Sequence, residues 1–232
     1  MRQIDVNADL GEEITDDAGL LAVVTSANLA CGFHAGTPAI MREVCDRAAE
    51  RGVAIGAQVS YADREHFGRR RLDVPFDLLA QQVADQVGLL REIAAAAGIS
   101  VRYLKPHGAL YNRVVDDAEQ AAAVLAGSGD LPVLGLPGGL LLEQARTAGR
   151  QVWQEGFPDR GYTPAGRLVP RDEAGALITE EAEIVRGALR LAERVDSVCL
   201  HGDSAGAVAH ARAVRAALEE AGFVVASFST GR

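Results

Sequence analysis

Short polar segments rich in glycine, histidine and acidic residues follow several apolar runs of this sequence. The segments cover residues 7–12, 28–36, 58, 105–108, 155–160 and 201–203. When parallel strands precede such segments, the carboxyl ends of the strands lie on one face of the fold, which is where active sites form. We therefore expect these segments to build one polar site, although they are spread over nearly the whole chain.

Two acidic residues and one lysine are the first candidates for catalysis. Asp9 and Glu12 can exchange protons with a substrate, and Gly11 between them allows a close approach of the backbone. Lys105 is the only lysine among the 23 basic residues, and an ammonium differs from a guanidinium in shape and in its tunable pKa. We predict catalytic roles for all three. The simpler alternatives are an aspartate that orders a turn, a solvated glutamate and a surface lysine.

Three of the five histidines lie in the glycine-containing segments that follow predicted strands. We predict that these three, His34, His107 and His201, are catalytic, because an imidazole exchanges its proton near neutral pH. A single histidine is at least as often structural, but three at equivalent places favour a shared site. His66 and His210 fall in a predicted loop and on a predicted helix, and we interpret them as structural or solvated.

A second group of polar residues is predicted to bind substrate. It consists of Asn7, Asn28, Gln58, Asp159, Arg160 and Asp203. Asp159 and Arg160 can clamp a carboxylate substrate or form an ion pair that orders their own loop. Asp203 can orient His201 or cap the following helix. No residue is predicted to bind a metal ion, because zinc spacings such as HExxH are absent.

Known signatures for nucleotides and for a serine nucleophile are missing from the sequence. It contains no GxxxxGK[ST] loop, no GxGxxG after the first predicted strand and no GxSxG. No ATP or dinucleotide site is therefore predicted in this chain.

Short apolar runs alternate with amphipathic helices along the chain. Strands are predicted at 4–8, 23–27, 53–57, 101–104, 131–136, 152–154, 197–200 and 223–228. Helices are predicted at 38–51 (with Thr37 as N-cap), 75–97, 117–126, 138–148, 179–194 and 204–221 (with Ser204 as N-cap). This alternation favours parallel strands joined by helices. We predict one α/β domain over residues 1–232, a deformed parallel β/α barrel of seven or eight strands; an open doubly wound sheet is the alternative.

Composition limits the class of protein. The chain has 232 residues, a formal net charge of −9 and three cysteines without CxxC spacing. A basic stripe that could neutralise phosphates is missing, which argues against nucleic acid. No apolar stretch approaches the ~20 residues that span a bilayer, and no signal peptide is recognisable. Unpaired cysteines fit a reducing compartment. We therefore expect a cytoplasmic protein that binds neither nucleic acid nor membranes.

Seven sequence runs, taken together and in order, resemble the LamB/YcsF family. They read NADLGE (7–12), TSANLACGFHAG (25–36), FGRR (67–70), KPHGALYN (105–112), EGFPDRGY (155–162), GRLVPR (166–171) and CLHGD (199–203). The combination is far more specific than any single run, and it extends over most of the chain.

The resemblance implies a deformed β/α barrel related to the glycoside hydrolase and deacetylase barrels. It also implies the role of an A subunit in an ATP-hydrolysing 5-oxoprolinase, which acts with B and C subunits. The family reaction converts 5-oxo-L-proline, ATP and water into L-glutamate, ADP and phosphate. On this basis ATP is a co-substrate that binds with Mg²⁺ to the partner subunits, and no tightly bound cofactor is expected.

The residues suggest a division of labour for that reaction. We expect the partner subunits to phosphorylate the lactam oxygen and the barrel to open the activated ring. Asp9 or Glu12 would activate water. Lys105 and the histidines at 107 and 201 would stabilise negative charge as it develops. Arg160 would hold the substrate carboxylate.

One position departs from the family pattern. The family usually reads GAHP where this chain has Gly56–Val59, so Gln58 replaces a histidine. Glutamine cannot shuttle a proton and is a poorer metal ligand than histidine.

Two alternatives stay open. One is a stand-alone metal-dependent amide or lactam hydrolase or deacetylase that uses Asp9 and the three strand-end histidines; Gln58 counts against it. The other is a non-catalytic scaffold role, against which the desolvation cost of gathering so many charged groups argues.

Overall fold

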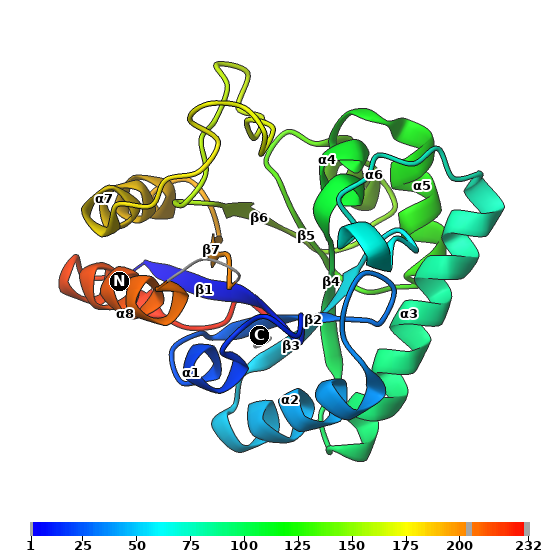
Figure 1. Ribbon diagram of the computed structural model, residues 1–232, viewed down its shortest axis with the longest axis horizontal. Coiled ribbons are helices and arrows are strands. Elements are labelled where there is room, and N and C mark those ends of the chain that lie inside the picture. Colours follow the sequence, from blue (N-terminus) through cyan, green and yellow to red (C-terminus); the bar gives the residue numbers. More distant parts are fainter. Residues whose placement is uncertain (1, 203–205, 230–232) are drawn as a thin grey trace.

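A closed parallel barrel forms the centre of the molecule in the computed structural model, which describes residues 2–202 and 206–229 (Figure 1). Among these residues, seven strands form the ring in chain order. They are β1 (Gln3–Leu10), β2 (Ser26–Ala30), β3 (Ala54–Val59), β4 (Val101–Pro106), β5 (Val133–Gly135), β6 (Val152–Gly156) and β7 (Ser197–Leu200). The ring closes because β1 pairs in parallel with both β2 and β7. The predicted barrel is confirmed, and the open sheet is excluded.

Helices surround the barrel on its outer side (Figure 1). They are α1 (Asp17–Leu21), α2 (Pro38–Arg51), α3 (Phe76–Ala96), α4 (Gly108–Asp116), α5 (Ala118–Gly127), α6 (Leu140–Thr147), α7 (Glu181–Ala192) and α8 (Ala207–Glu220), with a short 3-10 helix, η1 (Arg64–His66), after β3. Among the described residues, no helix is both long enough and apolar enough to cross a membrane.

The ends of α2 follow directly from its sequence. The Thr37 hydroxyl accepts a hydrogen bond from the Ile40 amide at 3.3 Å, and Pro38 occupies the first turn, where its missing N–H costs nothing. Gly52 ends the helix with φ of 67°, a left-handed conformation that glycine adopts without strain. The predicted boundaries of this helix are confirmed.

Side chains along β1 point alternately to the helices outside the barrel and into the barrel itself. Ile4 and Val6 belong to the hydrophobic core between the barrel and its helices. Asp5, Asn7 and Asp9 are equally buried but bond to polar groups of other strands. Successive side chains of a strand point to opposite faces. The side chains that β1 directs into the barrel are therefore polar, whereas those that it directs toward the helices are apolar.

Asp5 is one of these inward-facing polar residues and lies near the start of β1. Its carboxylate accepts hydrogen bonds from Thr25 and Ser26, each at 2.6 Å, and from Ser197. Burial raises the pKa of Asp5 to about 6, although the three hydroxyls favour its charged form.

Several predicted boundaries were wrong, for a common reason. β1 continues to Leu10 and β4 to Pro106, so Asp9 and Lys105 lie within strands and not after them. Polar residues that face the barrel interior interrupt the apolar pattern from which strand ends were predicted.

The other differences concern short elements. The last strand, β8 (Val224–Val225), has two residues and pairs with the start of β1. The second strand begins three residues later than predicted, and α1 and α4 were not predicted. The predicted N-cap Ser204 and the predicted site residue Asp203 lie outside the described residues.

Candidate active site

A cavity of about 600 Å³ opens where the barrel strands end. Its wall includes Asp9 from β1, Lys105 from β4 and His107 directly after β4. Phe157 and His201, which follow β6 and β7, also line it. The parallel arrangement thus brings four of the six residues predicted as catalytic to one cavity, as expected from the order of segments in the sequence.

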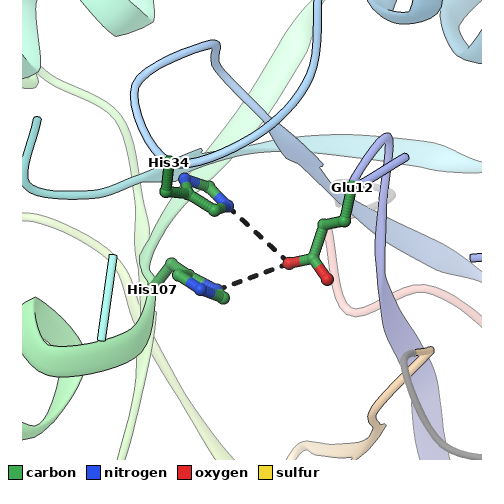
Figure 2. A group of neighbouring side chains, drawn as sticks. All are labelled: Glu12, His34 and His107. Carbon is green, nitrogen blue, oxygen red and sulfur yellow. Dashed lines mark ion pairs between the residues drawn. The ribbon is translucent and has the colours of Figure 1, made fainter. Parts of the chain in front are cut away.

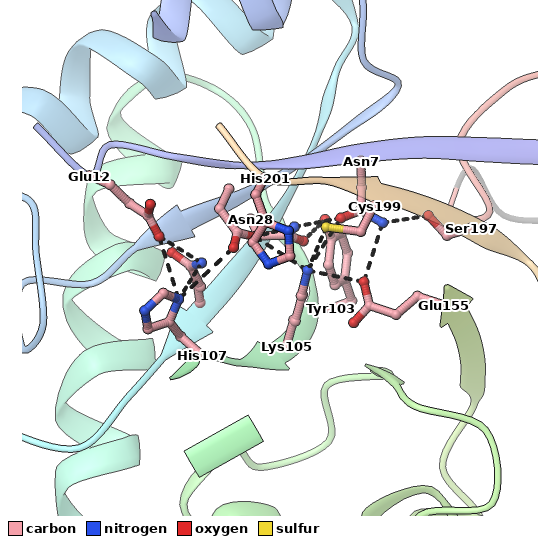
Figure 3. A network of polar contacts seen from close by, with 12 residues as sticks. Asn7, Glu12, Asn28, Tyr103, Lys105, His107, Glu155, Ser197, Cys199 and His201 are labelled. Atoms are coloured by element: carbon pink, nitrogen blue, oxygen red, sulfur yellow. Dashed lines mark hydrogen bonds and ion pairs between the residues drawn. The ribbon is translucent and has the colours of Figure 1, made fainter. Parts of the chain in front are cut away.

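Lys105 lies at the centre of a buried ion-pair network (Figure 3). Its Nζ is 3.0 Å from Glu155 Oε2 and 3.3 Å from Asp9 Oδ1. The same ammonium contacts Cys199 Sγ at 3.1 Å and Asn7 Oδ1 at 3.4 Å. The chain's one lysine is therefore not a surface residue: it links carboxylates of β1 and β6 across the barrel.

The charges of this network stabilise one another. Burial disfavours the ammonium of Lys105, but the Asp9 carboxylate, the Cys199 sulfur and Glu155 outweigh it and raise the lysine pKa well above 10.5. For Asp9, burial opposes ionisation, and Lys105 overcomes this and holds the carboxyl pKa below its usual 3.8. For Glu155, burial outweighs the attraction of Lys105 and raises the pKa. Asp9 and Lys105 therefore form an ionised pair.

Buried amides hold this ion pair in place. Asn28 Nδ2 donates to Asp9 Oδ1 at 2.9 Å and to Asn7 Oδ1 at 2.7 Å. The Tyr103 hydroxyl donates to Asn28 Oδ1 at 2.7 Å, and Asn7 Nδ2 donates to Ser197 Oγ at 2.6 Å. Both asparagines are fully buried. They fix the position of Asp9, while their predicted contact with substrate stays a prediction.

Glu12 belongs to a second cluster, with His34 and His107 (Figure 2). Glu12 Oε1 is 3.7 Å from His34 Nε2 and 3.4 Å from His107 Nδ1, and the two imidazole rings stack with centroids 4.0 Å apart. Gln58 Nε2 donates to Glu12 Oε1 at 3.1 Å and to His107 Nδ1 at 3.0 Å. Asp9 and Glu12, the two acids predicted as a pair, are linked through His107, whose Nδ1 lies 3.4 Å from Glu12 Oε1 and 3.9 Å from Asp9 Oδ2.

Both histidines of this cluster are neutral at neutral pH. Burial lowers the pKa of His34 to about 4. Burial, followed by the neighbouring His34, lowers the pKa of His107 well below 6.5. The His107 Nε2 lies 3.1 Å from the Phe67 carbonyl oxygen, which can only accept a hydrogen bond. The proton is therefore assigned to Nε2, and the Nδ1 lone pair faces Glu12 and Gln58.

His201 is positioned by Asp159. Asp159 Oδ2 accepts a hydrogen bond from the His201 backbone N–H at 3.0 Å and another from the ring Nδ1 at 2.8 Å. Burial opposes the charge of Asp159, but His201 outweighs it and holds the aspartate pKa below 3.8. The Phe157 ring packs beside the imidazole, with centroids 5.4 Å apart. An aspartate that accepts from Nδ1–H fixes the tautomer and orientation of a histidine that lines the cavity.

Arg160 also lines the cavity, but its guanidinium orders the loop between β6 and α7. Nε donates to the Ala176 carbonyl at 3.0 Å and Nη2 to the Val169 carbonyl at 2.6 Å. This loop extends away from the barrel at the top of Figure 1. The predicted role of Arg160 in binding a carboxylate stays a prediction.

Arginines are frequent on the wall of the cavity. The lining includes Arg69, Arg71, Arg113, Arg160, Arg167 and Arg171. Arg113 pairs with Asp73 and Asp117, whereas Arg69 lies over the Phe67 ring, 4.8 Å from its centroid. The wall also carries four aspartates, Asp9, Asp116, Asp117 and Asp172, so the six arginines and Lys105 leave an excess of positive charge that favours a small anionic ligand.

Sequence reasoning missed several residues of the site. Glu155 and Cys199 contact Lys105, which was predicted as catalytic, and Tyr103 contacts Asn28, which was predicted to bind substrate; none of the three was itself predicted as a site residue. Glu155 starts the polar segment 155–160 and Cys199 starts the run 199–203, so proximity to those segments was the available signal. Tyr103 carried no signal, because an aromatic residue in a strand is ordinarily core.

Comparison with known proteins agrees with the geometry. The profile of the LamB/YcsF family matches residues 4–232. The chain belongs to this family. It is 55% identical to a Streptomyces coelicolor protein that is named as the A subunit of 5-oxoprolinase, with 97% of this chain and all of the relative covered.

Solved structures show how far the family fold extends. A lactam utilization protein from Thermus thermophilus superposes with a TM-score of 0.90 at 37% identity and covers 97% of this chain and all of its own. The catalytic domain of a peptidoglycan N-acetylglucosamine deacetylase from Eubacterium rectale superposes with a TM-score of 0.55 at 11% identity, covering 99% of this chain and 89% of the deacetylase domain. The second likeness shows the fold alone, and it confirms the expected deacetylase-type barrel.

Proposed function

We propose that this chain is the A subunit of an ATP-dependent 5-oxoprolinase and that its barrel opens the lactam ring of 5-oxo-L-proline. The observation that carries the proposal is the full-length match, at 55% identity, to a protein that bears this name. The cavity supports it, because it combines acid–base groups with an arginine-rich wall that suits a small carboxylate substrate.

ATP and partner subunits complete the proposal. A five-membered lactam is an unreactive amide, so its opening needs activation. We assign ATP and its Mg²⁺ to B and C subunits, since this sequence lacks a P-loop. Phosphorylation of the lactam oxygen would make the ring carbon electrophilic. The barrel would then add water to that carbon and break the carbon–nitrogen bond, which leaves an acyl phosphate. Hydrolysis of this acyl phosphate by a second water would release phosphate and give glutamate. The cytoplasm, where ATP and reduced thiols are available, is the proposed location.

The geometry suggests which groups act in ring opening. Glu12 or Asp9 would take a proton from the attacking water. Asp9 is held ionised by Lys105, which keeps a negative and a positive charge fixed beside the reacting carbon. His201, oriented by Asp159, would give a proton to the departing ring nitrogen. Because Arg160 is engaged with loop carbonyls, it would attract the substrate carboxylate through its charge and not through a bidentate clamp.

Reconstitution with each component omitted in turn tests the proposal. The purified chain, the presumed B and C subunits, 5-oxoproline, ATP and Mg²⁺ are mixed, and glutamate is measured. Glutamate from the full mixture alone is the expected result. Glutamate from this chain without ATP or partners would instead establish a stand-alone hydrolase. If the full mixture forms glutamate at the normal rate with folded Lys105→Met in place of the parent chain, this chain acts as a scaffold. If all three proteins are folded and the full mixture forms no glutamate, the proposal is overturned.

A further inference from the structure

Three buried side chains present metal-binding atoms to one another beside the Lys105 network. Glu12, His34 and His107 each offer one ligand atom, and these atoms all lie within 4.8 Å of one another. They come from three separate loops, after β1, β2 and β4, and converge in Figure 2. The exposed fraction is 2% for Glu12, 1% for His34 and 7% for His107. This is therefore an enclosed group of donors and not a surface cluster of charge.

The ring nitrogens of His34 have no hydrogen-bond partner in the part of the chain that the structure describes, and both are buried. Its Nε2 lies 3.7 Å from Glu12 Oε1, which is beyond hydrogen-bond distance. A buried imidazole without partners is costly, and such groups call for an ion or a water molecule. The amide oxygen of Gln58 is also buried without a partner among the described residues.

His107 is oriented as a metal ligand would be. Its Nε2–H donates to the Phe67 carbonyl at 3.1 Å, which directs the Nδ1 lone pair toward Glu12. A ligating histidine nearly always donates its other N–H to a carbonyl or carboxylate in this way. The Phe67 carbonyl thus holds the His107 ring in the orientation that a ligand needs.

Gln58 can supply the fourth ligand. Its Nε2 now lies 3.1 Å from Glu12 Oε1 and 3.0 Å from His107 Nδ1, and its Oε1 is unpartnered among the described residues. Rotation of the Gln58 side-chain amide by 180° about its Cγ–Cδ bond exchanges the positions of Oε1 and Nε2. The oxygen would then take the position beside Glu12 and His107, and an amide oxygen is a metal ligand.

The separations fit a coordination shell. Bonds of about 2.0–2.2 Å to a zinc-like ion place neighbouring ligand atoms roughly 2.8–3.6 Å apart in tetrahedral or octahedral geometry. The contacts of Glu12 Oε1 are 3.1 Å to the Gln58 amide, 3.4 Å to His107 and 3.7 Å to His34. The contacts with Gln58 and His107 fall within that range, and the contact with His34 exceeds it by about 0.1 Å.

We propose that Glu12, His34, His107 and Gln58 form a site for one divalent transition-metal ion, in which the Gln58 amide turns its oxygen to the ion. Two imidazoles favour Zn²⁺ over Mg²⁺. Without the ion, the Gln58 N–H groups bridge Glu12 and His107 and hold the cluster together. The site is a property of this chain alone and does not depend on the proposed reaction.

Calorimetric titration of the chelator-treated chain with ZnCl₂, MnCl₂ and MgCl₂ tests the site. One Zn²⁺ per chain is expected, with a higher Tm and with weaker or no binding of Mg²⁺. His34→Gln should abolish this binding, and the matched control His210→Gln, on α8, should leave it unchanged. Circular dichroism establishes that each variant is folded. Absence of Zn²⁺ binding by the parent chain, or equal binding by folded His34→Gln, would overturn the proposal.

The role of Gln58 is tested by two further variants. Gln58→Leu should weaken Zn²⁺ binding by at least about 10-fold, because loss of a ligand costs no less than loss of a group that merely supports one. Gln58→Glu should bind at least as tightly as the parent, because it keeps an oxygen donor, and its Tm should rise more on adding Zn²⁺. The visible absorption of Co²⁺ bound to the parent should change in both variants. An unchanged spectrum and affinity in Gln58→Leu would exclude Gln58 as a ligand. Failure of the glutamate assay would affect none of these measurements.

Discussion

Lys105 Nζ lies 3.0 Å from Glu155 Oε2, and this contact links β4 to β6 inside the barrel. With Asp9 at 3.3 Å on its other side, the ammonium separates two buried carboxyl groups. Removal of the cation would leave these groups facing one another without compensation. The stability and the chemistry of the site therefore depend on the same residue.

Lys105→Met should abolish glutamate formation by the reconstituted complex and lower stability without unfolding the chain. Leaving a buried charge unpaired costs about 3–5 kcal/mol. The second change in Lys105→Met/Glu155→Gln removes one of the two carboxyl groups, so the double variant should recover part of that loss. Urea unfolding of the three proteins measures this. Equal stability of both variants would show that Glu155 is not coupled to the lysine.

Asp159→Asn and His201→Gln should each lower kcat by about 10²–10⁴-fold, the usual range for a positioned proton donor. The reason is that Asp159 holds the imidazole at two points. Because the two residues act as a unit, the double variant should be no slower than the slower single variant. Effects that multiply would indicate independent roles.

Asp5→Asn should change how stability depends on pH. The pKa of Asp5 is about 6 in the folded chain against 3.8 ordinarily, so between these values the native state binds a proton that the unfolded state lacks. Rising pH through this interval therefore removes about 3 kcal/mol of stability, at 1.36 kcal/mol per pKa unit. Relative to the parent, the variant should gain that amount between pH 4 and 7. Parallel stability curves from urea unfolding would contradict this.

The three cysteines should resist thiol reagents in the folded chain. All are buried, and burial raises the pKa of Cys31 to about 12 and that of Cys45 to about 11. Reactivity requires an accessible thiolate. At pH 8, a chromogenic disulfide reagent should label none within minutes in buffer and all three in denaturant. Rapid labelling of one thiol in buffer would show that its site opens easily.

Gly56→Ala should destabilise the barrel by about 1–3 kcal/mol, the usual cost of overpacking a core. A Cβ at this position would come within 2.2 Å of the Tyr103 ring, whose hydroxyl bonds to Asn28. Gly88→Ala is the matched control, because a Cβ there meets nothing within 4 Å and alanine favours a helix such as α3. The control should raise Tm. A lower Tm for both variants would point to a cause other than the Tyr103 contact.

Much of the fold was predictable from local pattern. Apolar runs separated by amphipathic helices indicated parallel strands, and Thr37 and Gly52 defined α2 to the residue. The position of the polar segments after strands indicated where the site would form. Strand ends were less predictable, since inward-facing residues such as Asp9 and Lys105 are polar in this barrel.

The sequence by itself determined the barrel, the family and the segments that reach the cavity. Only the tertiary structure decided which side chains meet. Asp9 and Glu12 are three residues apart, yet Asp9 pairs with Lys105 and Glu12 with the histidines. Asp9 is on the inward face of β1, whereas the chain turns at Gly11, with φ of 73°, before it reaches Glu12. Strand register and loop path set these contacts, and neither is encoded by spacing along the chain.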